Sequence, residues 1–131
     1  MSILDHLAHA GHNEQVCKHL CSKPSYSDWV ITTAFYSAIH YVRHLMLPVI
    51  VNGKSYSDFE HFFLEQRQRS EGRHGFQCRY VLQNYPEIEP NYRILLDMSN
   101  NARYINYAYT RDQANVAKES LADIKKYIIR E

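Results

Sequence analysis

Apolar residues recur at three- and four-residue steps along most of the chain, which is the spacing that one face of an α-helix requires. The pattern is clearest in residues 111–130, where lysine and glutamate side chains occupy positions between the apolar ones. The apolar positions there are Ala114, Ala117, Leu121, Ile124 and Ile128. We therefore predict that residues 111–130 form a surface helix with one buried stripe.

Residues 26–47 show a different pattern, because apolar residues surround most of the helical circumference. These residues are Trp29, Val30, Ile31, Ala34, Phe35, Ala38, Ile39, Val42, Leu45 and Met46. The one polar strip, also at helical spacing, comprises Thr33, Tyr36, Ser37, His40 and His44. We predict that this segment is the most buried helix of the fold.

Capping-box patterns divide the chain into helices. In each, a serine or threonine stands three residues before an acid or a glutamine, and the two side chains together cap a helix start. The pairs are Ser25 with Asp28, Ser57 with Glu60, and Thr110 with Gln113. The predicted helices span residues 2–22, 26–47, 58–69, 74–85, 89–109 and 111–130. Residues 48–54, which contain the turn signal Asn52-Gly53, are predicted to form a loop.

This plan determines the predicted fold class. Long helices with short connections pack as antiparallel neighbours. Four glycines and four prolines in 131 residues are few for the many turns of an all-β fold. We predict an all-α single domain over residues 1–131, built as an up-and-down bundle of four to five helices in which 58–69 and 74–85 form a pair interrupted near Gly72.

Composition and charge indicate where the protein is located, but they say less about its function. The formal net charge is +1, so any affinity for nucleic acid has to come from a local patch. The first residues lack the basic-then-apolar pattern of a signal peptide, and no apolar run is long enough for a membrane span. The three cysteines are an odd number, which favours reduced thiols. We expect a cytoplasmic protein that does not enter a membrane and carries no cofactor.

The first candidate site lies around Arg103. Asn100, Arg103 and Tyr107 stand at i, i+3 and i+7, so they share one face of the predicted helix 89–109, with Tyr104 beside them. A guanidinium offers a planar fork of donors to phosphate or carboxylate, and it also stacks on aromatic rings. The same residues fit a second interpretation, in which the arginine packs on tyrosine or pairs with a carboxylate of its own chain.

A second candidate is the most basic stretch of the chain, in which Phe76 and Tyr80 alternate with cations. The cationic residues are Arg67, Arg69, Arg73, His74 and Arg79. Basic side chains beside aromatic ones suit single-stranded nucleic acid, because phosphates need charge and bases need flat faces. The alternative is a solvated helical turn with local acidic partners such as Glu65 and Glu71.

Histidines and cysteines near the N-terminus suggest a metal site, which we weighed against an exposed histidine face. The residues are His6, His9, His12, Cys17 and Cys21. Zinc uses these residue types, but three histidines that step by three drift around a helix instead of converging, so we predict no metal site. His40 and His44 share a face that fits a metal site, hydrogen bonds between helices, or a cleft beside Tyr36. His74 and Cys78 share a face too, which is weak support for a thiol nucleophile.

Residues 28–40, with the sequence Asp-Trp-Val-Ile-Thr-Thr-Ala-Phe-Tyr-Ser-Ala-Ile-His, resemble the second helix of HEPN-domain proteins. The helix that carries Arg103 and Tyr104, followed by the alanine-containing last helix, is similar to that family as well. The resemblance implies a helical bundle that forms a homodimer with a cleft between protomers. It also implies a metal-independent ribonuclease, an inactive module that binds RNA or a nucleotide, or a toxin–antitoxin-like partner of a nucleotidyltransferase.

Active members of that family use an arginine followed four to six residues later by a histidine. Arg103 matches the arginine, but Ala108, Tyr109 and Thr110 stand where the histidine is expected. Tyr109 is the nearest substitute, and a phenol with a pKa of about 10 is a poor base beside an imidazole with a pKa of about 6.5. Arg69 and His74 also have this spacing, but they lie at a helical interruption in another part of the fold, so we interpret the spacing as a coincidence. His74 is still able to reach the same cleft.

Three hypotheses follow. In the first, the protein binds RNA or a nucleotide in a pocket to which Arg103 contributes a phosphate clamp. The other pocket candidates are Asn100, Tyr104, Tyr107, Tyr109, Arg73, His74, Arg79, Tyr36 and His40. In the second, the protein is a weak endoribonuclease in which Arg103 stabilises charge and His74 or His40 moves the proton, with Tyr109 as a further catalytic candidate. In the third, the tyrosines form a dimer or partner interface.

Overall fold

The computed structural model describes residues 1–105 and 108–130. The helices are α1 (Ile3–Leu20), α2 (Ser27–Met46), α3 (Phe59–Gln66), α4 (Arg73–Asn84), α5 (Glu89–Tyr104) and α6 (Arg111–Arg130), with a 3-10 turn η1 (Pro24–Tyr26) and strands β1 (Val49–Val51) and β2 (Lys54–Tyr56). The predicted helical class is confirmed. The described residues form six α-helices, one for each predicted helical segment, so the count of four to five helices for the bundle is not confirmed.

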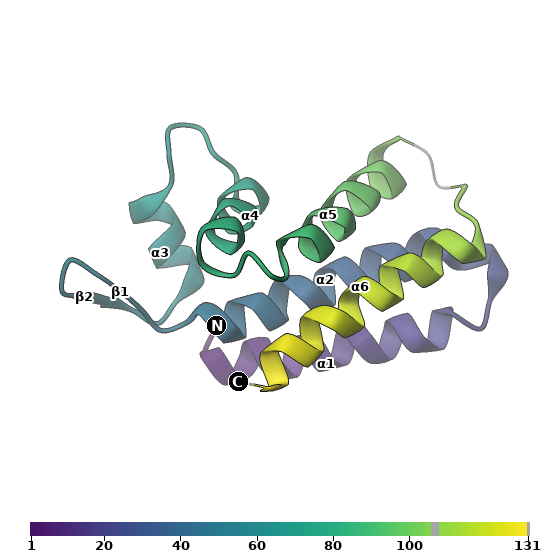
Figure 1. The fold of residues 1–131 in the computed structure, drawn as a ribbon, viewed down its shortest axis with the longest axis horizontal. Coiled ribbons are helices and arrows are strands. Elements are labelled where there is room, and N and C mark those ends of the chain that lie inside the picture. Colours follow the sequence, from purple (N-terminus) through teal and green to yellow (C-terminus); the bar gives the residue numbers. More distant parts are fainter. Residues whose placement is uncertain (106–107, 131) are drawn as a thin grey trace.

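The four long helices lie along one another, and α3, α4 and the two strands form a smaller group at one end (Figure 1). Helix α2 is central, because it packs against α1, α5 and α6, and α5 also packs against α6. Helix α4 contacts α5 and so connects the smaller group to the bundle. Both chain termini lie at the same end of the bundle (Figure 1).

Helix α2 is the most buried helix, as its pattern predicts, with twelve buried residues. Trp29 is an exception, because its side chain is 55% exposed, and Leu45 is half-buried. Trp29 stands four residues before Thr33 and seven before Tyr36, so it begins the polar strip and does not face the core. Helix α6 buries the whole predicted apolar stripe.

The capping predictions had mixed outcomes. At α6 the backbone N–H of Gln113 donates to the Thr110 hydroxyl at 3.2 Å, and the backbone N–H of Thr110 donates to the Gln113 side-chain oxygen at 2.9 Å. This capping box is confirmed. The Ser25 prediction is wrong, since η1 occupies that position and α2 starts without a side-chain cap. The start of α3 is capped one residue later than predicted, by Asp58.

Residues 48–54 are not simply a loop. Strands β1 and β2 pair antiparallel on either side of Asn52 and Gly53, whose φ angles are +51° and +81°. Such angles match the two-residue turns that suit hairpins, so the dipeptide forms a hairpin turn. The sequence analysis missed the strands because each has only three residues.

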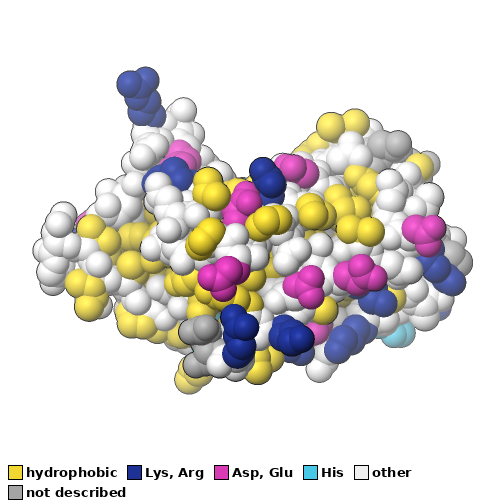
Figure 2. Space-filling view, in the orientation of Figure 1, with side chains coloured by type: hydrophobic (Ala, Val, Ile, Leu, Met, Phe, Trp, Pro, Cys, Tyr) yellow, Lys and Arg dark blue, Asp and Glu magenta, His cyan; other side chains and the backbone are white. Residues whose placement is uncertain are grey.

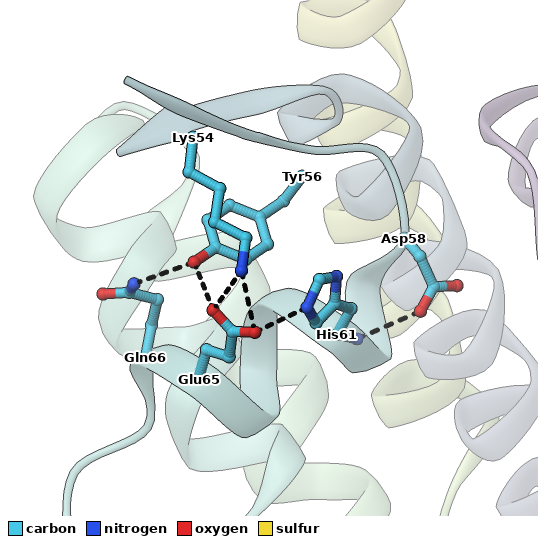
Figure 3. A network of polar contacts seen from close by, with 6 residues as sticks. All are labelled: Lys54, Tyr56, Asp58, His61, Glu65 and Gln66. Atoms are coloured by element: carbon cyan, nitrogen blue, oxygen red, sulfur yellow. Dashed lines mark hydrogen bonds and ion pairs between the residues drawn. The ribbon is translucent and has the colours of Figure 1, made fainter. Parts of the chain in front are cut away.

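A polar network attaches the hairpin to α3 (Figure 3). The Glu65 carboxylate accepts hydrogen bonds from Lys54 at 2.9 Å and from the Tyr56 hydroxyl at 2.7 Å, and it pairs with His61 at 2.6 Å. These three partners lower the pKa of Glu65 to about 2. The network therefore positions the hairpin from outside, while the Tyr56 and Phe59 rings fill the core beneath it.

The surface carries charges of both signs. In the view of Figure 2, acidic and basic side chains are mixed over α6, and hydrophobic side chains gather over α4 and α5. Basic side chains follow one another along the lower edge of this face, with acidic side chains beside them (Figure 2). Among the described residues, no helix has the length and apolar character needed to cross a membrane.

Candidate functional site

Arg103 lies in the last turn of α5, and its guanidinium is partly exposed. Nη1 donates to the Tyr36 hydroxyl at 3.0 Å, Nη2 donates to the Asn100 side-chain oxygen at 2.9 Å, and Nε donates to the backbone oxygen of Ser99 at 3.2 Å. All three acceptors are neutral. Among residues 1–105 and 108–130 no carboxylate forms an ion pair with Arg103, so its charge is oriented without being neutralised.

Aromatic rings surround the same guanidinium. Its central carbon lies 5.1 Å from the centre of the Tyr104 ring, 5.4 Å from that of Tyr36 and 5.8 Å from that of Phe35. Tyr104 is 76% exposed, so one face of its ring is available to a ligand. Asn100, Tyr36 and Tyr104 thus lie beside Arg103.

The end of α5 differs from the prediction. The helix stops at Tyr104 rather than at residue 109. Tyr107, a predicted pocket residue, lies outside the described residues. The Tyr109 hydroxyl donates to the backbone oxygen of Met98 at 3.3 Å and accepts a hydrogen bond from the Asn101 amide. Because both contacts tie Tyr109 to α5, the site that we describe does not use its hydroxyl as a base.

His74, from the start of α4, reaches the same aromatic ring as Arg103. The His74 ring centre lies 5.3 Å from that of Phe35, on which Arg103 also packs. Burial, and then the positive charges of Arg103, Arg43 and Arg73, lower the pKa of His74. Its Nδ1 atom is buried and has no hydrogen-bond partner among the described residues. His74 is therefore a neutral imidazole near several arginines, and its Nδ1 atom makes no hydrogen bond to the described residues.

A cleft opens beside Arg103, between the first turns of α2 and the last turn of α5. Its volume is about 270 Å³. The lining residues are Asp28, Trp29, Thr32, Ala102 and Arg103. The sequence analysis did not place Asp28 or Trp29 in a site. The signal was present, because Trp29 has the same helical spacing as Thr33 and Tyr36 on the polar strip.

Two arginines of the basic stretch have carboxylate partners from their own chain. Arg73 makes two contacts with Glu60, including a hydrogen bond from its Nε at 2.8 Å, and Arg79 binds Glu71 through two hydrogen bonds of 2.9 Å. Local acidic partners were one of the two interpretations of this stretch. The site that we describe depends on neither arginine.

His40 belongs to a separate histidine group. Its Nδ1 lies 2.9 Å from Nδ1 of His6, and its ring centre lies 4.2 Å from that of His9. Burial, and then neighbouring positive charges, lower the pKa of His6 to about 4 and that of His40 to about 3. An exposed histidine face is wrong for His6, which is 2% exposed. His9 and His12 are exposed.

In the described part of the chain, neither the cysteines nor the histidines of α1 form a metal site or an activated thiol. Among the described residues, no group of three or more histidine, cysteine or acidic side chains is arranged to hold a metal ion. Cys17, Cys21 and Cys78 are free thiols. Burial raises the pKa of the Cys78 thiol, which lowers its reactivity as a nucleophile.

Comparison of the chain with family models, curated proteins and solved structures found no match. The HEPN resemblance stays a prediction.

Proposed function

We propose that the protein binds single-stranded RNA or a nucleotide at the cleft beside Arg103. The observation that carries this proposal is a guanidinium that is held only by neutral acceptors and lies next to exposed aromatic rings. A guanidinium has five N–H donors. Three of them have partners among the described residues, so two are available to a phosphate.

The chemistry of the surroundings fits an anion that carries a flat base. Arg43 and Arg103 both lower the pKa of His74, so positive potential reaches this part of the molecule although the formal net charge is only +1. The exposed rings of Trp29 and Tyr104 offer stacking surfaces, which are worth about 1–3 kcal/mol per base in single-strand binding. Phosphate binding by Arg103 and base stacking on these rings together allow RNA to bind at one local site, although the surface as a whole carries charges of both signs.

The test is the fluorescence anisotropy of labelled single-stranded RNA at several salt concentrations. Arg103→Ala should weaken binding about tenfold, because it removes hydrogen bonds to a charged group. It should also reduce the slope of log affinity against log salt by about one. Arg130→Ala, at the far end of the bundle, is the matched control and should bind like the wild type. Equal, salt-insensitive binding by all three proteins contradicts the proposal.

A second candidate is a weak metal-independent endoribonuclease. The observation in its favour is that His74 and Arg103 contact the same ring, with His74 held neutral by burial and by nearby arginines. A neutral imidazole accepts a proton from a ribose hydroxyl, and a guanidinium stabilises the charge that develops on the phosphate. RNA incubated with the protein and EDTA should be cut, and His74→Gln should stop the cutting, whereas His19→Gln should not. Intact RNA excludes this candidate.

The homodimer and the nucleotidyltransferase partner, which the HEPN resemblance implies, stay predictions.

A further inference from the structure

We propose that the cleft beside Arg103 selects a guanine base, and that Asp28 is the residue that recognises it. This inference rests on the proposed function, since it names the base that accompanies the phosphate at the same site. It starts from three residues that line one cleft. Asp28 and Trp29 come from the first turn of α2, and Arg103 comes from the last turn of α5.

The Asp28 side chain is partly exposed and unused. Among the described residues its carboxylate accepts no hydrogen bond and forms no ion pair, although its backbone oxygen accepts from Thr32 at 2.9 Å. Asp28 and Arg103 line the same cleft without pairing with each other. The cleft therefore presents an open carboxylate and an open guanidinium, so a complementary ligand has to bring hydrogen-bond donors to one and an anion to the other.

A guanine nucleotide meets both requirements. An ionised carboxylate only accepts hydrogen bonds, and its two oxygens suit two adjacent N–H groups. Guanine presents such a pair on its Watson–Crick edge, at N1 and at the exocyclic N2. Adenine and cytosine place an acceptor nitrogen beside their amino group, and uracil places its single N–H between two carbonyls. Guanine is thus the standard RNA base whose edge satisfies the carboxylate fully.

Trp29 completes the arrangement. Its indole is adjacent to Asp28 in the sequence, lines the same cleft and is 55% exposed. Proteins that read single-stranded RNA stack a base on an aromatic ring and hydrogen-bond its Watson–Crick edge. With Trp29 as the stacking surface, Asp28 reads the edge of the base while Arg103 binds the phosphate.

Asp28 also lies in the first turn of α2, where its negative charge interacts favourably with the helix dipole and stabilises the helix. That simpler role requires only a negative charge and does not distinguish one base from another. Base discrimination is therefore the measurement that separates the two roles.

The experiment measures competition by three unlabelled RNA oligonucleotides, UUGUU, UUIUU and UUAUU, against a labelled UUGUU probe. Inosine lacks only the exocyclic amino group of guanine. The wild type should prefer UUGUU over UUAUU about tenfold, as expected for a bidentate contact, with UUIUU between them. Asp28→Asn should bind all three oligonucleotides within about twofold of one another, since an amide offers one acceptor instead of two. Asp123→Asn, an exposed acid on α6, is the control and should keep the preference.

The possible outcomes of this competition experiment separate the guanine inference from the proposed function. Loss of the guanine preference in Asp28→Asn, with binding of UUAUU retained and circular dichroism unchanged, supports the inference. Equal binding of the three oligonucleotides by the wild type overturns the inference but leaves the proposed function standing if Arg103→Ala weakens binding. An equal loss of affinity for all three in Asp28→Asn also overturns it. No binding of any oligonucleotide by the wild type refutes both the inference and the proposed function.

Discussion

Acid should destabilise this protein well above the pH at which carboxylates titrate, because of the pair formed by His6 and His40. The two Nδ1 atoms lie 2.9 Å apart, so one ring donates and the other accepts, and the accepting imidazole has to be neutral. Burial disfavours the charged form of both rings, Arg43 adds a positive charge near both, the N-terminal amine adds another near His6, and Asp58 acts in the opposite direction on His6. The His6 side chain is 2% exposed, so hydration does little to stabilise its protonated form.

The expected magnitude follows from the lowered pKa of His6, which is about 4 in the folded protein. In the unfolded chain a histidine has a pKa of about 6.5, so between these values the unfolded state binds more protons and stability falls as the pH falls. Integrated from about pH 7.5 to about pH 5, one such histidine reduces the free energy of unfolding by about 2 kcal/mol. His40 acts in the same direction. A loss of this size is large against a typical total of about 5–15 kcal/mol.

The assay is urea denaturation followed by circular dichroism at about pH 7.5 and about pH 5, with the wild type and His6→Gln. Glutamine keeps a hydrogen-bonding group but does not titrate. We expect the stability lost between the two pH values to shrink by about 2 kcal/mol in His6→Gln. His19→Gln, at an exposed position of the same helix, should retain the wild-type loss. The same loss in His6→Gln as in the wild type would refute the reasoning.

Further predictions concern the scaffold that holds the site, and each is measured as a change in the free energy of unfolding. Ile124→Ala should cost about 2–5 kcal/mol because the side chain is fully buried, and Ile129→Ala, 63% exposed on the same helix, should cost less than about 0.5 kcal/mol. Equal effects of the two substitutions would contradict the described core. Tyr41→Phe should cost about 1–2 kcal/mol, because it removes the 2.7 Å hydrogen bond from a buried hydroxyl to Glu14, and a neutral result would argue against that bond. Gly53→Ala should cost about 1 kcal/mol because φ is +81° there, and an unchanged or raised stability would contradict the hairpin turn.

The long helices were predictable because their residues repeat a strong local pattern. Residues 111–130 and 26–47 fold as their apolar periodicity indicates, and Thr110 with Gln113 starts α6 as predicted. The end of α5 was missed because residues 105–109 contain neither glycine nor proline to mark a stop. The exposure of Trp29 was missed because indole was grouped with core residues by type, although its spacing places it on the polar strip.

The candidate site was predictable only in part, since it is assembled by tertiary contacts. Asn100 and Tyr104 lie on the same helix as Arg103, so spacing found them. The contact of His74 and Arg103 with one ring joins α4, α2 and α5, and no local pattern encodes it. The ion pair of Arg73 with Glu60 spans thirteen residues between two helices and was equally invisible in the sequence.

The central claim is that the Arg103 guanidinium is open to an anion at a cleft shared with Trp29. Trp29 is the single tryptophan of the chain, so the intrinsic tryptophan fluorescence reports on this cleft alone. Titration of the protein with single-stranded RNA should quench the fluorescence to saturation, and Arg103→Ala should raise the RNA concentration at the midpoint about tenfold. Fluorescence that RNA leaves unchanged, or titration curves that coincide for the wild type and Arg103→Ala, would contradict the claim.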